Sequence, residues 1–301
     1  MINLTEEPDG VDNKTVDEYY QQPMVPHKIF RKVEYCSYFL TALLFFLPNA
    51  VFAQATQAAK IELGSATAKN GFQNETEIQN KFNNWKVDAD ARLWLPVMGY
   101  SLAEIEIVTA TKPHGEKADV EVRIKAKSDE KVEGISIKLV SSPNGFNQID
   151  KRWLSHYVKM WKMPTSVEDA LKRFVGETPP SKPGRAKNRV FLDELDAADR
   201  ESVIAFFTNN KKEIVSDIFQ GDGLHAAEWV MVAFKATVKT RWALRRIEDV
   251  IEFYSAGPVV VTSGGNLKIG RITMQRKGGD GGRETANMLQ FKINPALLLD
   301  H

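Results

Sequence analysis

An aspartate, a serine and a lysine form the pattern in this sequence that is most suited to catalysis. Asp119 opens one alternating, β-rich segment, and Ser136 and Lys138 lie two residues apart in the next one. Residues two apart share one face of a β-strand, so Ser136 and Lys138 should point the same way while their neighbours point into a core. An aspartate on a neighbouring strand would then share a site with the lysine.

Such a site has the composition that metal-dependent hydrolysis of phosphodiesters requires. Carboxylate oxygens bind Mg²⁺, and an ammonium group orients or deprotonates water and offsets charge on the phosphoryl group. Glu75, at the start of a predicted helix, offers a second acid; its alternative role is a favourable interaction with the helix dipole. Aspartate and lysine at this spacing are common, so a strand-end Asp119 and a solvent-facing Lys138 are the alternative interpretation.

The turn after the lysine strand carries side chains suited to nucleic acid. Gly145 opens the turn, and the residues with this chemistry are Phe146, Asn147, Gln148 and Lys151. An aromatic side chain on such a turn can wedge between bases, and amide groups can read base edges. Packing of the Phe146 ring beneath the loop is the alternative.

A glycine-rich loop near the C-terminus is the second candidate for nucleic-acid binding. Its polar residues are Gln275, Arg276, Lys277, Asp280 and Arg283. The glycines allow close backbone approach, and forked donors pair with guanine and with phosphate. The segment 265–292 is basic within a chain that has 40 Lys and Arg against 39 Asp and Glu. Local positive charge of this kind favours a polyanion.

The elements that must position these residues are those of an α/β protein. The predicted helices cover residues 74–85, 91–98, 149–161, 197–209, 212–219 and 243–254. The predicted strands cover residues 104–109, 118–125, 134–140, 227–236, 259–262, 267–275 and 288–293. The Pro/Gly/Lys stretch 176–187 is the best candidate for an internal boundary.

Composition and motifs exclude several classes of protein. A hydrophobic content of 43% over 301 residues excludes a disordered chain, and the single cysteine, Cys36, excludes an intramolecular disulfide or a cysteine-based zinc site. Residues 221–226 match G-x-G-x-x-A, but they follow a predicted helix and precede a predicted strand. A dinucleotide-binding loop has the reverse order, so a turn that ends the helix is expected.

Residues 1–58 differ from the rest of the chain. Residues 36–53 are uncharged, follow several basic residues and precede Ala53-Gln54-Ala55, which is typical of a signal peptide or anchor. The long polar leader and Pro48 argue against export. A gene start assigned too far upstream is the third interpretation. We therefore expect one domain over 59–301 and an additional N-terminal segment over 1–58.

From Ile61 to the C-terminus the sequence resembles the HinP-type type II restriction endonucleases, which cut the palindrome GCGC, and more distantly the MspI-type enzymes. The stretches that carry the resemblance are 61–85, 137–153, 176–180, 226–233 and 271–295. The resemblance implies the PD-(D/E)xK nuclease fold, a mixed central β-sheet flanked by helices. It also implies Mg²⁺-dependent cleavage of double-stranded DNA that leaves 5′-phosphates.

The resemblance also assigns roles to individual residues. By position, Asp119 matches the metal-binding aspartate and Lys138 the catalytic lysine. Ser136 stands where the superfamily has an acid and the HinP- and MspI-type enzymes have an amide, so the metal would rely on Asp119, the Ile137 carbonyl, phosphate oxygens and Glu75. A serine adds no negative charge, which places metal affinity in question.

For DNA recognition, Phe146 matches the family's wedging aromatic, Gln148 its neighbouring amide, and 275–283 the block that contacts bases. The resemblance further implies a cognate cytosine methyltransferase, a cytoplasmic protein and, as one arrangement, a homodimer. Family chains begin near Ile61, which favours a wrongly assigned start for residues 1–58. Two alternatives remain: a DNA-binding protein whose Ser136 marks lost catalysis, and an exported, less specific nuclease.

Overall fold

A computed structural model describes residues 66, 69–113, 117–221, 223, 225–237, 239–279 and 283–301. All of these residues belong to one compact unit, Phe52–His301, so the stretch 176–187 is a loop within that unit and not a domain boundary. The segment 1–58, with its apolar run, lies outside the described residues. Among the helices of the described part, none has the length and apolar character needed to cross a bilayer.

The first of two β-sheets is mixed and has the strand order β1-β2-β3-β5-β6. Its strands are β1 (Ile105–Thr111), β2 (Val120–Ala126), β3 (Asp129–Val140), β5 (Trp229–Phe234) and β6 (Arg241–Arg246). β3 pairs with β5 in parallel, and the other neighbours are antiparallel. Every residue of β5 is buried, as expected for a strand covered on both faces.

The second sheet is antiparallel throughout and has the order β4-β10-β9-β8-β7. Its strands are β4 (Asn147–Arg152), β7 (Val259–Val261), β8 (Leu267–Ile269), β9 (Ile272–Arg276) and β10 (Leu289–Ile293). β4 begins only seven residues after β3 ends. The chain therefore passes directly from the strand of Ser136 and Lys138 into the edge of the second sheet.

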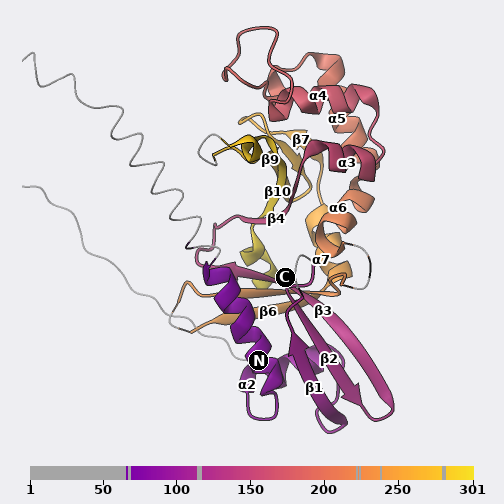
Figure 1. The fold of residues 1–301 in the computed structure, drawn as a ribbon, viewed down its shortest axis with the longest axis vertical. Helices are drawn as coiled ribbons and strands as arrows, with labels where there is room; N and C mark the ends of the chain where they lie inside the picture. The colour runs from indigo at the N-terminus through magenta and orange to yellow at the C-terminus, as the bar shows by residue number, and fades with distance from the viewer. Residues whose placement is uncertain are drawn as a thin grey trace, which may run out of the picture. The chain divides into compact units, whose positions relative to one another are not determined.

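Helices pack against both sheets, as Figure 1 shows. Besides a helix over 69–83, the α-helices are α2 (Ala89–Val97), α3 (Leu154–Met160), α4 (Thr165–Val175), α5 (Ala197–Asn209), α6 (Lys211–Gln220) and α7 (Ile247–Ser255). Short 3-10 turns cover Leu192–Glu194, Glu284–Asn287 and Pro295–Leu299. Helix 69–83 and α2 pack on one face of the first sheet. Helices α3 to α7 share a larger core with the second sheet and with the other face of the first sheet, which α7 contacts through β5 and β6.

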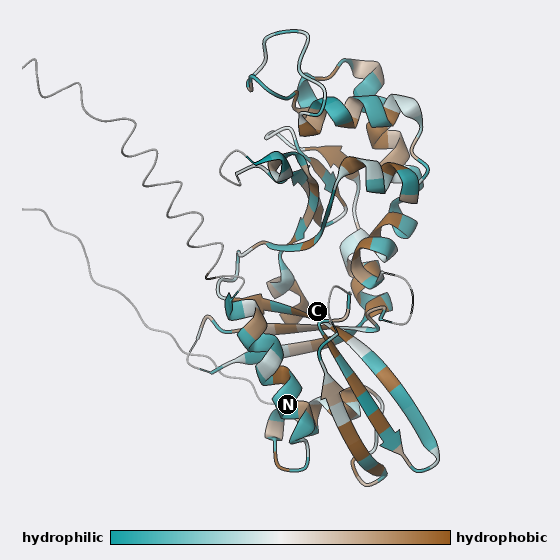
Figure 2. Cartoon of the chain, viewed as in Figure 1, coloured by the Kyte–Doolittle hydropathy of each residue, from teal (hydrophilic) through white to brown (hydrophobic). Residues whose placement is uncertain are grey.

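Hydropathy explains these two cores. Brown, hydrophobic residues in Figure 2 follow the strands and the inner sides of the helices. On β3, Ile135 and Ile137 belong to the smaller core, whereas Val230 and Val232 of β5 belong to the larger one. The alternation of a strand thus sends side chains to both faces of the first sheet.

Most of the predicted elements are confirmed. Observed elements match the predicted helices at 74–85, 91–98, 197–209 and 212–219, and the predicted strands at 104–109, 118–125, 134–140, 227–236, 259–262 and 288–293. The turn after α6 is also confirmed: α6 ends at Gly221, whose φ is +70°, and the chain then enters β5.

Four predictions were wrong or incomplete. The predicted helix 149–161 is helical only over α3, whereas its first residues, 149–152, belong to β4, because they pair with β10 far along the chain. The predicted helix 243–254 begins instead as β6, which pairs with β5, and only then becomes α7. The predicted strand 267–275 is two strands joined at Gly270, where φ is +57°. Helix α4 was not predicted.

Candidate active site

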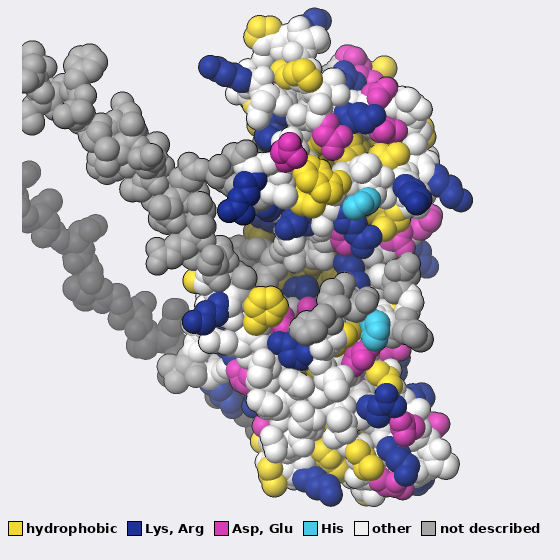
Figure 3. Space-filling model, viewed as in Figure 1, with side chains coloured by type: hydrophobic (Ala, Val, Ile, Leu, Met, Phe, Trp, Pro, Cys, Tyr) yellow, Lys and Arg dark blue, Asp and Glu magenta, His cyan; other side chains and the backbone are white. Residues whose placement is uncertain are grey.

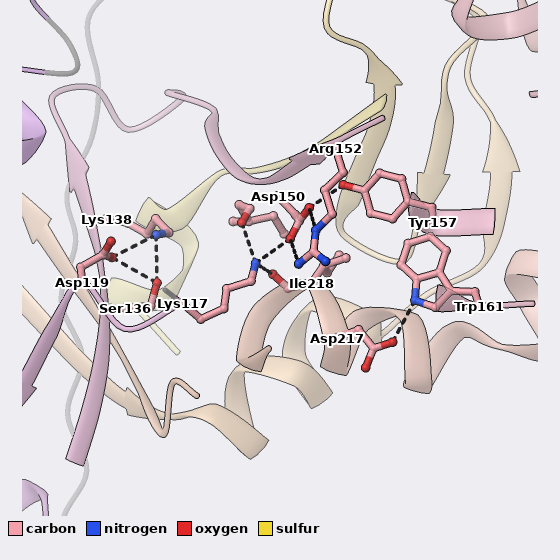
Figure 4. Close-up of polar contacts among 11 residues, drawn as sticks. Lys117, Asp119, Ser136, Lys138, Asp150, Arg152, Tyr157, Trp161, Asp217 and Ile218 are labelled. Carbon is pink, nitrogen blue, oxygen red and sulfur yellow. Dashed lines mark hydrogen bonds and ion pairs between the residues drawn. The ribbon is translucent and has the colours of Figure 1, made fainter. Parts of the chain in front are cut away.

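Asp119, Ser136 and Lys138 converge at one end of the first sheet (Figure 4). The Lys138 Nζ atom donates to Ser136 Oγ at 3.0 Å and lies 3.6 Å from Asp119 Oδ2. Ser136 Oγ donates to the same carboxylate oxygen at 3.3 Å. The structure thus brings these three side chains together, and their catalytic role stays a prediction.

The backbone holds this arrangement in place. Asp119 lies just before β2, where its N–H donates to the Ile135 carbonyl at 2.9 Å. Its Oδ2 accepts the Ile137 N–H at 2.5 Å, so the carboxylate continues the β2–β3 ladder. On its other side β3 pairs with the fully buried β5. The site therefore stands on the most rigidly packed strands of the sheet.

The oxygens of the site suit a hard divalent cation. Asp119 Oδ2, Ser136 Oγ and the Ile137 carbonyl oxygen all lie within 3.6 Å of Lys138 Nζ, which also donates to the Ile137 carbonyl at 3.0 Å. Mg²⁺ takes oxygen ligands and often only one or two protein carboxylates, with water and substrate phosphate completing its shell. No cluster of three or more His, Cys, Asp or Glu side chains that could hold a metal occurs in the described residues. The donor set therefore fits Mg²⁺ only with substrate and water ligands.

Glu75 lies at the same end of the first sheet but is already paired. Its Oε2 is 2.9 Å from Lys112 Nζ, and both side chains are mostly buried. The register of β1 and β2 pairs Thr111 with Glu121, so Lys112 follows at the end of the sheet where Asp119 lies. Glu75 as a metal ligand stays a prediction, and it would have to leave Lys112 to act as one.

A buried ionic network beside the site links it to the second sheet (Figure 4). Lys117, two residues before Asp119, donates to Asp150 Oδ2 on β4 at 2.8 Å and to the carbonyls of Ile149 and Ile218. Arg152 and Tyr157 also donate to the Asp150 carboxylate. Lys117 thus joins the strand of Asp119, β4 and the end of α6.

The charges of this network shift the pKa values of its members. Burial lowers the pKa of Lys117 more than Asp150 raises it. Burial pushes the pKa of Asp150 upward, but the charge and hydrogen bond of Lys117, the hydrogen bond of Tyr157 and the charge of Arg152 bring it below its ordinary value. Burial and the neighbouring Asp150 raise the pKa of Tyr157. Asp150 is therefore ionised and Tyr157 neutral at pH 7.

Gly221 makes room for this network. A Cβ atom at this residue would lie 2.4 Å from Lys117 Cγ. The glycine that matched a dinucleotide motif therefore serves to end α6 and to let Lys117 reach the Ile218 carbonyl. Sequence reasoning did not single out Lys117 or Asp150, because Asp150 lies in a segment that was predicted to be helical and its partner Lys117 lies far from it along the chain.

The residues predicted in the turn after β3 differ in how exposed their side chains are. Phe146 lies just before β4, and Asn147, Gln148 and Lys151 lie on it. Phe146 is 61% exposed, so the alternative that its ring packs beneath the loop is wrong. Gln148 is exposed and Lys151 half-buried. Asn147 donates through its side-chain amide to the Leu139 carbonyl at 2.9 Å, which ties the turn to β3. In this structure the Asn147 amide thus binds a backbone carbonyl of the same chain.

The residues predicted in the C-terminal loop lie at and beyond the end of β9. Gln275, Arg276 and Lys277 are half-buried, and Arg283 is exposed. The Arg276 guanidinium donates to Asn287 Oδ1 at 2.5 Å, and burial lowers its pKa. Asp280 lies outside the described residues.

The outward face of the second sheet combines the predicted Gln148, Lys151 and Gln275 with four polar residues that were not predicted as site residues: Lys268, Thr273, Lys292 and the buried Gln290. Cross-strand partners lie on the same face of a sheet, and the register gives two polar rows on the side away from the core. One row is Lys268, Thr273, Lys292 and Gln148, and the other is Gln275, Gln290 and Lys151. Burial lowers the pKa of Lys292. The alternation of β9 and β10 was the signal that could have revealed this face.

Comparison with known proteins assigns the family. A sequence model of the R.HinP1I restriction endonuclease family matches residues 98–299. No curated protein sequence matches the chain. Among solved structures, the restriction endonuclease MspI in complex with its cognate DNA aligns with a TM-score of 0.53 at 10% identity, covering 73% of this chain and 87% of that one.

The structural likeness to MspI shows the fold, and the family match, which covers residues 98–299, shows the family. A mixed central sheet flanked by helices, with an aspartate and a lysine at the end of neighbouring strands, is the PD-(D/E)xK arrangement. The family match contains Asp119, Ser136 and Lys138, together with both sheets. The chain belongs to the R.HinP1I restriction endonuclease family and is a type II site-specific deoxyribonuclease of the PD-(D/E)xK fold.

Proposed function

We propose that this enzyme cleaves double-stranded DNA at the palindrome GCGC, depends on Mg²⁺ and leaves 5′-phosphates. The observation that carries the proposal is the convergence of Asp119, Ser136 and Lys138 within a chain of this family. In support, the MspI structure that shares the fold holds cognate DNA. The nuclease domain would be 59–301, and residues 1–58 an additional segment.

Hydrolysis joins a water oxygen to phosphorus and breaks the bond to the 3′ oxygen, which departs with a proton. When bound, Mg²⁺ would neutralise phosphate charge and lower the pKa of water. Asp119 and the Ile137 carbonyl would hold it, with Glu75 as a candidate further ligand. Lys138 places its ammonium beside these oxygens, where it offsets negative charge on the phosphoryl group.

Ser136 is suited to a positioning role in this site. Its hydroxyl accepts the hydrogen bond of Lys138 and donates to Asp119, so it holds the two charged groups apart at a fixed spacing. Its side chain is buried, with 6% of the residue exposed. A hydroxyl can keep this geometry without charge. We infer that metal binding is weaker with serine than with an acid at this position, but that catalysis is retained.

The outward face of the second sheet and the turn at Phe146 would bind the duplex. Guanine presents two acceptors in the major groove and cytosine one donor. The Lys and Gln side chains of this face, and Arg283, can pair with them. Phe146 projects freely enough to enter the base stack. Figure 3 shows basic and acidic side chains interspersed over the face in view, so recognition would depend on local groups and not on net charge.

The enzyme's partners follow from this activity. Host DNA would need a cognate cytosine methyltransferase that modifies GCGC, and the cytoplasm is the compartment where both would act. A homodimer would present two sites to the two strands of a palindrome.

Cleavage of plasmid by the purified full chain tests the proposal. Unmethylated and GCGC-methylated plasmid are incubated with and without Mg²⁺, and the ends of the products are sequenced. We expect discrete fragments with 5′-phosphate ends at GCGC, only from unmethylated DNA and only with Mg²⁺. Tight binding to GCGC duplex without cleavage would instead show a DNA-binding protein, and scattered ends a less specific nuclease.

A further inference from the structure

An arginine of the loop before the first 3-10 turn lacks a counter-ion. The Arg189 guanidinium carbon lies 3.9 Å from the centroid of the Phe191 ring and 5.5 Å from that of the buried Phe174. The residue is half-buried. Within the described ranges, no carboxylate lies within ion-pair distance of Arg189, and its side chain has no hydrogen-bond acceptor. The aromatic rings fix the plane of the guanidinium and leave its donors unused.

The neighbouring Arg185 provides the contrast. Its guanidinium also lies over the Phe191 ring, at 4.3 Å. It is neutralised by Asp193, to which it donates, and by Glu194 at 3.3 Å. The two acidic residues of this loop thus form ion pairs with Arg185, whereas Arg189 forms none with the described residues and has only the longer-range charge of Glu194 near it.

Arg276, at the end of β9, lies beside this loop. The β8–β9 register pairs Leu267 with Met274, so Arg276, two residues beyond Met274, lies at the end of the sheet where β8 begins, next to the turn that contains Gly265. A Cβ atom at Gly265 would lie 2.6 Å from Phe191 Cβ and 2.7 Å from Arg185 Nη2, so the loop rests on this end of the sheet.

Arg276 bonds to no charged group among the described residues. Its acceptor there is the neutral side-chain oxygen of Asn287, and its buried Nε has no partner. Across the part of the chain that the structure describes, no carboxylate pairs with it. Burial lowers the pKa of Arg189, the positive charges of Arg276 and Arg185 lower it further, and the negative charge of Glu194 offsets part of this effect. Arg189 and Arg276 therefore repel each other.

We propose that Arg189 and Arg276, with the Phe191 ring as a platform, bind one backbone phosphate of the DNA duplex. Two guanidinium groups with free donors match the charge and the forked geometry of a phosphate, whereas a neutral base edge would leave the repulsion in place. Lys277 and Arg283 continue from the same strand end into the loop expected to contact DNA. The inference rests on the proposed function.

The test compares Arg189→Gln with the matched control Arg185→Gln in the full chain. Each variant removes one guanidinium group that lies over the Phe191 ring, but the charge of Arg185 is neutralised by Asp193 and Glu194. Affinity is measured by fluorescence anisotropy in EDTA, over a range of salt, with one duplex that contains GCGC and one that does not. Arg189→Gln should weaken binding to both duplexes by roughly three- to tenfold and lower the salt slope by about one phosphate contact. Arg185→Gln should change both quantities much less.

Further variants keep the inference falsifiable if Arg189→Gln is unstable in thermal unfolding. Arg189→Lys keeps the charge and should retain the salt slope. Arg276→Gln should show the same loss as Arg189→Gln, and the two changes together should cost less affinity than the sum of the two single losses. Wild-type affinity and salt slope in both Arg189→Gln and Arg276→Gln would overturn the phosphate site while leaving the proposed function intact. A loss confined to the GCGC duplex would also overturn it, because it would indicate a base contact. Absence of binding to any duplex by the wild type would reject the proposed function itself.

Discussion

The catalytic end of the first sheet and the outward face of the second sheet hold their polar side chains in different ways. Asp119, Ser136 and Lys138 bond to one another and to the backbone. Gln148 and Lys151, among the described residues, make no hydrogen bond through their side chains, and Phe146 is exposed. The proposed catalytic groups are thus fixed before substrate arrives, whereas the proposed recognition groups are available to reach it.

The Lys117–Asp150 network joins these two regions, and breaking it should have the largest effect. Lys117→Met leaves Asp150 buried with only Arg152 and Tyr157 as partners. Removing one partner of a buried ion pair costs about 3 kcal/mol of unfolding free energy. Urea unfolding measures this loss, with the exposed Lys127→Met as a control. A loss below about 0.5 kcal/mol would show that the network does not hold the two sheets together.

Tyr157→Phe perturbs the same network without changing its charge. It removes the hydroxyl that donates to Asp150 Oδ1 and should cost about 1–2 kcal/mol. The pKa of Asp150 is lowered in the folded protein, so its stabilisation is present above its unfolded pKa of about 4 and is lost as pH falls through the folded value. Losing the hydroxyl raises that folded pKa. The midpoint of acid unfolding, followed by circular dichroism, should therefore move to higher pH; an unmoved midpoint would contradict the assignment.

Ser136→Ala tests the catalytic end alone. It removes the hydroxyl between Lys138 and Asp119, and loss of a neutral hydrogen bond of this kind is worth about 1 kcal/mol. The Mg²⁺ concentration for half-maximal cleavage should rise several-fold, while duplex affinity in EDTA stays the same. If duplex affinity changed and the Mg²⁺ requirement did not, the serine would belong to recognition instead.

Phe146→Ala should have the smallest effect on stability, within about 0.5 kcal/mol, because the ring is 61% exposed. Its effect should appear in recognition. The fluorescence of 2-aminopurine placed in the GCGC site should rise less on binding than with wild type, and cleavage at near-cognate sites should increase. Equal fluorescence in the two proteins would show that the ring does not enter the duplex.

Local pattern was sufficient to predict the catalytic trio and insufficient elsewhere. Alternation along 134–140 places Ser136 and Lys138 on one face, and Asp119 needs only the adjacent strand. The strand β4 looked helical because its partner, β10, lies far along the chain. Local spacing likewise carries no signal for the approach of Arg189 to Arg276 or of Lys117 to Ile218. Pairings of this kind are fixed by tertiary packing, which overrides local propensity.

Lys138→Ala provides the most direct test of the central claim, that the end of the first sheet cuts DNA held by the second. Single-turnover cleavage and duplex affinity are measured on the same GCGC oligonucleotide for the variant and the wild type. We expect cleavage to fall by on the order of 10³-fold, because an ammonium that offsets phosphoryl charge is lost, while affinity in EDTA stays within a few-fold. Cleavage at the wild-type rate by the variant would contradict the assignment of this site.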